Sequence, residues 1–393
     1  MDLYFACEGH FMKDAQGKFY SLNAGFTTKL WKRYLSSFDR VYVFARVKYD
    51  ETYIGNELLR ADTSNVSFIE LPEYVGPVQF MLVRRQIKRI ISSNISFKRA
   101  YLCRLPGQIG TILIDALRQH KVPYSCEVVG DPWDVFGPDG VKHPLRPYFR
   151  YRGRYLLTKQ VAAASSVLYV TQRSLQNRYP ASKGIFTVGA SDVLLSKETM
   201  ASKPKLYKTK EVFEIISIGS LGQMYKSPDV VIKALAELKS HNIVCHLSWL
   251  GDGIYREKME ELARSLSVTD CITFCGNVPP KEVIIKLQHS DIFILVSRTE
   301  GLPRALVEAM GQGLPCIGSN VGGIPELLES SVIIPKGSAT ELASKIMYLI
   351  QNPDFYNKQA ERNLLESKKY ESSFLDEKRK AFYNEIKRIA MHS

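Results

Sequence analysis

The stretch that decides the fold is DIFILVSRTEGLPRALVEAMGQGLPCIGS, residues 291–319. It opens with a short run of apolar residues, 292–296, and passes through a Gly-Leu-Pro turn at 301–303. An amphipathic segment follows and ends at Gly313, after which comes a second apolar run. Pro303 suits the first position of a helix and Gly313 suits the position after its last turn. The stretch therefore predicts a strand–helix–strand unit of a parallel sheet.

The same alternation extends outward from this stretch through most of the second half of the chain. We predict strands at 212–220, 244–251, 271–278, 291–297 and 315–323, and helices at 227–242, 255–268, 280–290 and 303–313. The first half alternates less regularly, with strand-like runs at 40–47, 99–105 and 124–130. Strands that alternate with helices of ten to fifteen residues indicate an α/β fold. We expect two Rossmann-like, doubly wound parallel-sheet domains that face each other across a cleft.

Composition shifts divide the chain. Residues 196–211, SKETMASKPKLYKTKE, are polar and Lys-rich with few apolar residues, which is typical of a linker. We predict an amino-terminal domain at 1–195, a carboxy-terminal domain at 212–370, and a final helix at 371–393 that packs back toward the first domain.

Composition excludes several classes of protein. The chain of 393 residues is 45% hydrophobic and 24% charged, which is ordinary for a soluble globular protein. No apolar run approaches the roughly 18 residues of a membrane-spanning helix, and the start MDLYFACEGHFMKD lacks the pattern of a secretory signal. The seven scattered cysteines are typical of reduced thiols, and Cys271 and Cys275 lack the companion ligands of a zinc site. We expect a cytoplasmic protein.

The net charge of +13 is concentrated in the first half. Residues 1–200 hold 28 Lys and Arg against 17 Asp and Glu, a balance of +11, and the rest of the chain is nearly neutral. Nucleic acid, a phospholipid surface and a phosphorylated substrate all fit that sign. The chain contains no recognised nucleic-acid-binding module, so we do not expect nucleic acid as a partner.

Two carboxylates flank the Gly-Leu-Pro turn. Glu300 lies in the predicted loop, beside the unpaired amides that open the helix and that can bind hydroxyls or anions. Glu308 falls on the polar face of the same helix, four positions after Arg304. An equally simple interpretation is a surface ion pair between Arg304 and Glu308, with Glu300 solvated in its loop.

The order of motifs in the second half resembles glycosyltransferase family 4, retaining enzymes with the GT-B fold that use nucleotide-sugar donors. The motifs are SIGSLGQMYKSPDVVIKAL, GDGIYREKMEELA, FCGNVPPKEV and SRTEGLPRALVEAMGQGLPCIGSNVGGIPEL. The first half resembles the family more loosely. By this resemblance, Glu308 holds the ribose hydroxyls of the nucleotide. Glu300, with the amides of Gly301, Leu302 and Pro303, meets the transferred sugar, and Lys226 neutralises the donor diphosphate.

The resemblance assigns further residues and shows one departure. Many relatives have an Arg where this chain has Ser220, so the donor site lacks that second cation. The remaining residues that the resemblance implies are Gly251, Asn277 and Val278 near the nucleotide base, Gly17 near the donor phosphates, and Asp131 or Asp134 near the acceptor hydroxyl. No Asp-x-Asp motif is present, which is consistent with transfer that needs no metal or other cofactor.

A basic amphipathic segment at 78–99 adds a membrane hypothesis. Its apolar residues Phe80, Val83, Ile87 and Ile90 share one helical face, and Arg84, Arg85, Lys88 and Arg89 lie around the rest. Such a helix is typical of a protein that binds an anionic membrane surface. The alternative is a helix whose apolar face packs on the sheet and whose charges are solvated.

We therefore expect a retaining glycosyltransferase of the hexosyl type. Its donor would be a UDP- or GDP-linked sugar bound by the carboxy-terminal domain. Its acceptor, lipid-linked or an oligosaccharide, would be bound by the amino-terminal domain, in the synthesis of a surface polysaccharide such as O-antigen, capsule or exopolysaccharide. Three alternatives stay open: a nucleotide-sugar epimerase of the same fold, a GT-B scaffold that has lost activity, and a basic nucleic-acid-binding protein.

Overall fold

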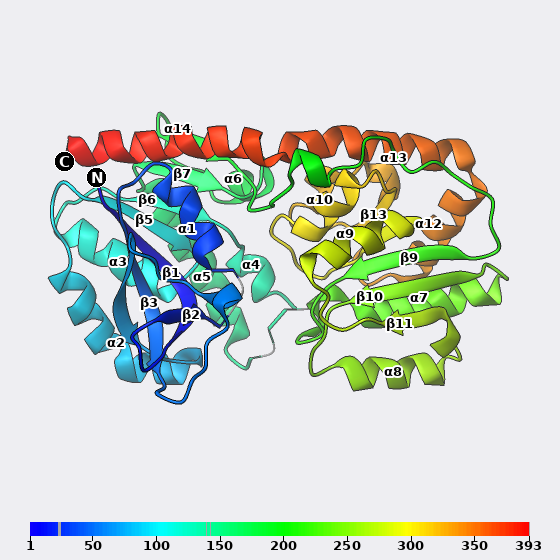
Figure 1. The fold of residues 1–393 in the computed structure, drawn as a ribbon, viewed down its shortest axis with the longest axis horizontal. Helices are drawn as coiled ribbons and strands as arrows, with labels where there is room; N and C mark the ends of the chain where they lie inside the picture. The colour runs from blue at the N-terminus through cyan, green and yellow to red at the C-terminus, as the bar shows by residue number, and fades with distance from the viewer. Residues whose placement is uncertain (23–24, 139, 142, 393) are drawn as a thin grey trace. The chain divides into compact units, whose positions relative to one another are not determined.

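The computed structural model describes residues 1–393 except 23–24, 139, 142 and 393. The chain forms two compact units. Unit 1 comprises residues 1–132, 151–190 and 376–393, and unit 2 comprises residues 133–150 and 191–375. Each unit is built on its own parallel sheet (Figure 1).

The sheet of unit 1 is parallel throughout, apart from one antiparallel hairpin strand. Its strands, in spatial order, are β4 (Val66–Pro72), β3 (Val41–Tyr49), β1 (Leu3–Lys13), β5 (Ala100–Leu105), β6 (Ser125–Val128), β7 (Ser166–Tyr169) and β8 (Phe186–Gly189), with β2 (Phe19–Ser21) paired to β1. The chain runs from β1 outward to β3 and β4, then crosses to β5 on the other side of β1. The strand order therefore reverses between β1 and β5.

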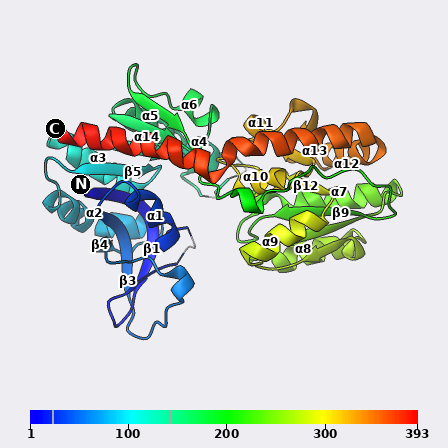
Figure 2. The ribbon, with the colours of Figure 1, turned by 45° about the horizontal axis from the view of Figure 1, so that its top comes forward.

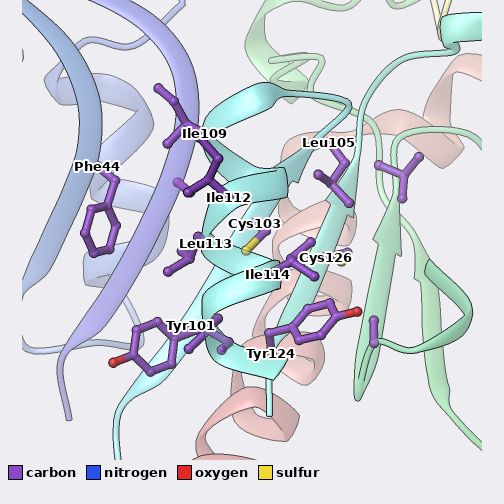
Figure 3. Close-up of a cluster of buried hydrophobic side chains, with 14 of the residues drawn as sticks. Phe44, Tyr101, Cys103, Leu105, Ile109, Ile112, Leu113, Ile114, Tyr124 and Cys126 are labelled. Carbon is purple, nitrogen blue, oxygen red and sulfur yellow. The ribbon is translucent and has the colours of Figure 1, made fainter. Parts of the chain in front are cut away.

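Helices cover both faces of this sheet. They are α1 (Thr28–Leu35), α2 (Gly76–Ser93), α3 (Gln108–Gln119), the part of α5 (Arg146–Ala162) from residue 151 onward, and α6 (Ser174–Arg178), with the short turn η1 (Glu57–Leu59). Helix α4 (Pro132–Val135) lies in unit 2 except for its first residue. On one face, α2, α3 and α5 bury side chains such as Ile87, Ile112 and Leu157 against the strands. Figure 3 shows part of this core, where Leu113 of α3 lies beside Cys103 of β5. On the other face, the ring of Trp31 in α1 lies 5.7 Å from that of Phe5 in β1.

Strands β1 and β3 continue past the point where β5 stops pairing. Residues 10–13 of β1 pair with residues 46–49 of β3, whereas the pairing of β1 with β5 ends at Ala6 and Cys103. The extension carries the β1–β2 hairpin and the connection from β3 to β4 (Figure 2). The carboxyl-terminal parts of β1, β3 and β4 therefore extend beyond the end of β5, next to the point where the strand order reverses.

Unit 2 repeats the architecture with a six-stranded sheet in which every pairing is parallel. Its strands, in spatial order, are β11 (Ile272–Phe274), β10 (Cys245–Leu250), β9 (Phe213–Ile218), β12 (Ile292–Leu295), β13 (Cys316–Ser319) and β14 (Ile333–Ile334). Its helices are α7 (Pro228–Ser240), α8 (Arg256–Ser265), α9 (Pro280–His289), α10 (Arg304–Gly311), α11 (Ile324–Leu327), α12 (Ala339–Gln351) and α13 (Pro353–Ser367). Its short turns are η2 (Lys197–Thr199), η3 (Met224–Lys226), η4 (Thr269–Cys271), η5 (Ser330–Val332) and η6 (Lys368–Tyr370). The strand order reverses between β9 and β12.

Residues 196–211, which composition marks as a linker, lie against unit 2. Lys205 N donates to Gly313 O at 3.0 Å, and the ring of Tyr207 packs edge-on against that of Tyr356 at 5.5 Å. The last helix, α14 (Ser372–Met391), begins in unit 2 and from Asp376 onward belongs to unit 1. There the ring of Tyr383 lies 5.4 Å from that of Tyr34 in α1.

All seven cysteines are free thiols. Cys7, Cys103 and Cys126 are buried in unit 1, Cys245 and Cys316 are buried in unit 2, and Cys271 and Cys275 are half-buried. Across the part of the chain that the structure describes, no helix is both long enough and apolar enough to cross a membrane.

Candidate active site

The strongest concentration of functional groups in unit 2 lies where the strand order reverses. Lys226 follows β9 and Glu300 follows β12, two strands that are neighbours in the sheet although 74 residues separate the side chains. Lys226 Nζ lies 2.5 Å from Glu300 Oε1, and the two side chains are only 12% and 9% exposed. In open parallel sheets, ligands bind beyond the carboxyl ends of the strands at such a reversal. The sequence placed both residues at this edge, and the structure brings them into contact.

Neighbouring turns hold the loop of Glu300 from two sides. Ser297 Oγ donates to Glu300 Oε1 at 2.6 Å, and Ser319 Oγ of β13 donates to the carbonyl of Ser297 at 2.6 Å. Behind the loop, Gly323 N donates to Gly301 O at 2.7 Å. Gly322 has φ +51°, and a Cβ added there would lie 2.0 Å from the carbonyl oxygen of Glu300. The glycine pair after β13 is therefore required for the loop to reach its position.

Arg298 fixes the segment that presents Lys226. Its guanidinium donates to Asp229 Oδ2 at 2.7 Å and to Met224 O at 2.5 Å, and its amide donates to Tyr225 O at 2.7 Å. The segment then turns through Ser227, whose φ of +54° is left-handed, before α7 begins at Pro228. The loop after β12 thus positions both partners of the Lys226–Glu300 pair. Sequence reasoning missed Arg298, although a polar Ser-Arg pair directly after a buried strand was the available signal.

Glu308 lies in the second turn of α10 and does not form the surface ion pair that the sequence allowed. Among the residues that the structure describes, no ion pair joins it to Arg304. Burial raises the pKa of the Glu308 carboxyl, and the charge of Arg304 only partly offsets this effect. Gln312, four positions after Glu308 on the same face of the helix, is 5% exposed, so this face is buried rather than solvated.

The start of α10 corrects one detail of the predicted site. Pro303 is the N-cap of the helix, and it has no N–H to offer a ligand. The amides available for hydroxyls or an anion at this turn therefore belong to Gly301, Leu302 and Arg304, and Pro303 contributes only its shape and its carbonyl.

Ser220, where the resemblance implies a cation in related enzymes, connects the loops after β9 and β10. Its hydroxyl donates to Asp252 O at 3.2 Å and accepts from Gly222 N at 3.0 Å. Gly251 has φ +128°, and a Cβ there would lie 2.2 Å from Gly219 O, so the two loops touch through backbone. Ser220 therefore has a structural role within these loops.

The predicted base-binding residues follow the next strand. Gly251 N donates to Gly276 O at 2.8 Å, which joins the loop after β10 to the loop after β11. Asn277 and Val278 come directly after Gly276, with Asn277 exposed and Val278 half-buried. The structure thus brings Ser220, Gly251, Asn277 and Val278 to the same edge as Lys226 and Glu300. A contact of these residues with a base stays a prediction.

Two predicted site residues lie in unit 1. Asp131 is buried after β6, where it pairs with Arg178 and accepts from Tyr179 Oη at 2.5 Å. Its carboxylate is therefore already engaged by its own unit. Gly17 forms the turn of the β1–β2 hairpin with φ +77°, and a Cβ added there would meet nothing within 4 Å. The proposed contacts of both residues with substrates stay predictions.

The basic segment is helix α2, and its apolar face is used by the fold. Ile87 is buried, and Phe80, Val83 and Ile90 pack against the same core, so this face is not available to a membrane. The predicted membrane-facing cations Arg84, Arg85, Lys88 and Arg89 are all exposed. A second apolar set, which the sequence analysis did not single out, is exposed beside them: Val75, Val78, Met81 and Leu82, each at least 66% exposed.

The described residues of the site form no cluster typical of a protein-held metal. Among the residues described, no group of three or more His, Cys, Asp or Glu side chains is placed to hold an ion. Transfer without a metal stays a prediction. The Lys226 ammonium and the amides at the start of α10 are the groups in the site suited to an anion.

Residues 197–364 match the family model described as "Glycosyl transferases group 1". Protein CapJ from Staphylococcus aureus is 29% identical over 360 residues, which is 91% of this chain and 87% of that protein. The putative colanic acid biosynthesis glycosyltransferase WcaL from Salmonella typhimurium is 33% identical over 142 residues, which is 34% of this chain and 35% of that protein.

Among solved structures, Anabaena Alr3699/HepE in complex with UDP and glucose aligns with a TM-score of 0.66 at 15% identity. The alignment covers 98% of this chain and 99% of that one. The predicted fold class, an α/β GT-B fold built from two Rossmann-like parallel-sheet domains, is confirmed.

Proposed function

We propose that this chain, a glycosyltransferase with the GT-B fold, moves a sugar from a nucleoside diphosphate donor to a glycan acceptor, with retention of anomeric configuration. The observation that carries the proposal is the Lys226–Glu300 pair at the strand-order reversal of unit 2. A similar structure, HepE from Anabaena, is described in complex with UDP and with UDP-glucose, which supports a uridine diphosphate donor here.

Each residue of the site has a distinct role in the proposed transfer. The bond between the anomeric carbon and the diphosphate oxygen breaks, so negative charge grows on the leaving diphosphate. Lys226 stabilises that charge, and the amides at the start of α10 assist it. Glu300 faces the sugar ring, where positive character develops, and Glu308 accepts from the ribose hydroxyls. A new bond forms between the acceptor hydroxyl oxygen and the anomeric carbon, and the proton of that hydroxyl is released.

We further propose that the acceptor belongs to a surface polysaccharide and is carried on a lipid. The partial similarity to WcaL, named for colanic acid biosynthesis, supports the polysaccharide part. The exposed cations and apolar side chains of α2 support peripheral binding to an anionic membrane. Cations attract the leaflet, and apolar side chains beside them can enter the region between headgroups and acyl chains.

The test of the donor is a thermal-shift screen with uridine, guanosine, adenosine and thymidine diphosphates. A ligand that binds only the native state raises the apparent stability. We expect a single preferred diphosphate and a smaller effect of the matching nucleoside. With the corresponding sugar donor and an acceptor extract, product analysis should detect a new glycosidic bond. An isomerised donor without transfer would instead indicate an epimerase, and no stabilisation by any diphosphate would refute the proposed donor site.

A further inference from the structure

The sheet of unit 1 has its own strand-order reversal, between β1 and β5, and polar side chains gather there as well. Glu8 and His10 lie on β1, and Arg46 lies on β3. Glu73 and Tyr74 directly follow β4. All five residues therefore lie at the carboxyl-terminal parts of these three strands. In unit 2 the corresponding place holds the Lys226–Glu300 pair. The rule that places ligands at a reversal therefore marks this edge of unit 1 as a second candidate ligand position.

The charges of this cluster of side chains disfavour an anionic ligand. Glu8 Oε1 accepts from Ile109 N, in the first turn of α3, at 2.7 Å. The amide that could bind a phosphate at this helix start is thus occupied by a carboxylate of the protein. Burial raises the pKa of the Tyr74 hydroxyl, which stays protonated and donates to Glu8 Oε2 at 2.9 Å. The guanidinium of Arg46 lies 3.3 Å from the same oxygen, so the positive charge of Arg46 is already balanced by Glu8.

Three side-chain atoms of the cluster have no hydrogen-bond partner among the residues that the structure describes: Arg46 Nε and Glu73 Oε2, which are buried, and His10 Nε2, which is not. His10 Nδ1 lies 2.6 Å from Glu73 Oε1, and both side chains are 26% exposed. Nε2 of His10 has no hydrogen-bond partner among the residues that the structure describes, and it is not one of the buried unpaired atoms. Because a carboxylate beside Nδ1 favours the tautomer protonated there, Nε2 presents a lone pair. That atom can accept from a hydroxyl.

We infer that His10 and Glu73 form the hydroxyl-binding pair of an acceptor subsite in unit 1, and that this subsite takes a neutral sugar ring rather than a phosphate. The inference rests on the proposed function, since it assigns the acceptor of that reaction. In this arrangement a sugar hydroxyl donates to His10 Nε2, and Glu73 is a positioning residue that fixes the imidazole through Nδ1. The cation of this cluster, Arg46, already pairs with Glu8, and the remaining carboxylate and imidazole suit hydroxyls rather than phosphate oxygens.

The test measures binding of four methyl glycosides, those of glucose, galactose, mannose and N-acetylglucosamine, by saturation-transfer NMR. The wild type should bind at least one. His10→Ala should weaken that binding at least about tenfold, because the hydroxyl loses its acceptor. His10→Gln, which keeps a polar atom near the position of Nε2, should recover most of the affinity. His120→Ala, at the exposed end of α3 in the same unit, is the matched control and should bind as the wild type does.

Two further measurements separate this subsite from the donor site and from a purely structural role. Stabilisation by uridine diphosphate, which depends on residues of unit 2, should be unchanged in His10→Ala. Glu73→Gln keeps an acceptor for Nδ1–H and should weaken glycoside binding less than Glu73→Leu does. Equal glycoside affinity of the wild type and His10→Ala overturns the inference, as does a wild type that binds none of the four glycosides. A wild type that binds glycosides but no nucleoside diphosphate refutes the proposed donor and leaves the subsite standing.

Discussion

Glu308 is a carboxylate in surroundings that disfavour its charge. Burial raises its pKa above the ordinary value of 4.5. Between the unfolded and folded pKa values the native state binds more protons than the unfolded state, so the free energy of unfolding should fall as the pH rises through that window. Glu308→Gln should remove this dependence, measured by urea denaturation between about pH 4 and 8. Glu257→Gln, at an exposed position in the first turn of α8, should retain it.

The same carboxylate should be needed for the nucleotide. Glu308→Ala is expected to weaken binding of the preferred nucleoside diphosphate by about 1.5–3 kcal/mol, the range for a charged hydrogen-bond acceptor. Isothermal calorimetry on the two proteins measures the difference. An unchanged affinity would remove Glu308 from the donor site.

The Lys226–Glu300 pair should separate binding from turnover. Lys226→Ala should abolish the preference for the diphosphate over its nucleoside, because the cation that contacts the phosphates is lost. Glu300→Gln keeps the shape of the side chain and should lower kcat while the diphosphate binds as before. Equal losses of kcat and of nucleotide affinity in Glu300→Gln would indicate that Glu300 only binds the nucleotide or supports the structure of the site.

At the residue scale, the sequence could predict this pair but not its supports. Lys226 and Glu300 follow strands that were recognisable as strands, and parallel strands end at a common edge. Arg298 and Asp229 meet across 69 residues, and nothing in the pattern marks them as partners. The engagement of Asp131 by Arg178 and Tyr179 was equally hidden, since it depends on how a later helix end returns to the sheet.

At the element scale, the turn after β13 supports the loop that carries Glu300 through a glycine. Gly322→Ala should destabilise unit 2 and weaken nucleotide binding, since a Cβ there would lie 2.0 Å from the carbonyl oxygen of Glu300. Gly337→Ala has a similar φ of +80° but no atom within 4 Å, so it should cost only about 1 kcal/mol of unfolding free energy. Equal effects in the two variants would mean that the contact behind Glu300 is unimportant.

Helix α2 shows why periodicity alone could not settle its role. A stripe at positions 80, 83, 87 and 90 fits a helix on a membrane and a helix on a sheet equally well, and the sheet buries it. The residues that stay exposed, at 75, 78, 81 and 82, occupy the first turns of the same helix. Their exposure depends on where the helix begins relative to β4, which the sequence pattern does not fix.

At the scale of the whole molecule, the uneven charge predicts a response to salt. We expect the protein to sediment with vesicles that contain anionic phospholipid at low ionic strength and to be released at high ionic strength. Each cation near an anionic surface contributes about 1 kcal/mol, and the effect fades over a Debye length. Changing Arg84, Arg85, Lys88 and Arg89 together to Gln should abolish sedimentation.

The control for that variant keeps the charge. Replacing the three arginines of the set with lysine, with Lys88 unchanged, should preserve sedimentation. Nucleotide affinity should be the same in all three proteins, because the proposed donor site lies in unit 2. A wild type that ignores anionic vesicles at low salt would favour a soluble acceptor.

The global fold was easier to predict for the second half than for the first. In unit 2 nearly every strand is followed by a helix, so the alternation is visible in the sequence. In unit 1 the β1–β2 hairpin interrupts the pattern. Strands β3 and β4 are joined by a connection that holds only the short turn η1. Strand–helix alternation is a weak guide wherever neighbouring strands connect without a helix.

The buried cysteines give each unit its own reporter of unfolding. The thiolate is the form that alkylating reagents attack, and burial raises the pKa of Cys7 in unit 1 and of Cys245 in unit 2 to about 12. In the native protein, iodoacetamide should therefore modify the half-buried Cys275 first and the half-buried Cys271 more slowly, since burial and the charge of Asp270 also raise the pKa of Cys271. Brief alkylation along a denaturant series, read by peptide mass spectrometry, would show whether the two units open together or one before the other. A nucleoside diphosphate should delay modification of Cys245 and Cys316 in particular.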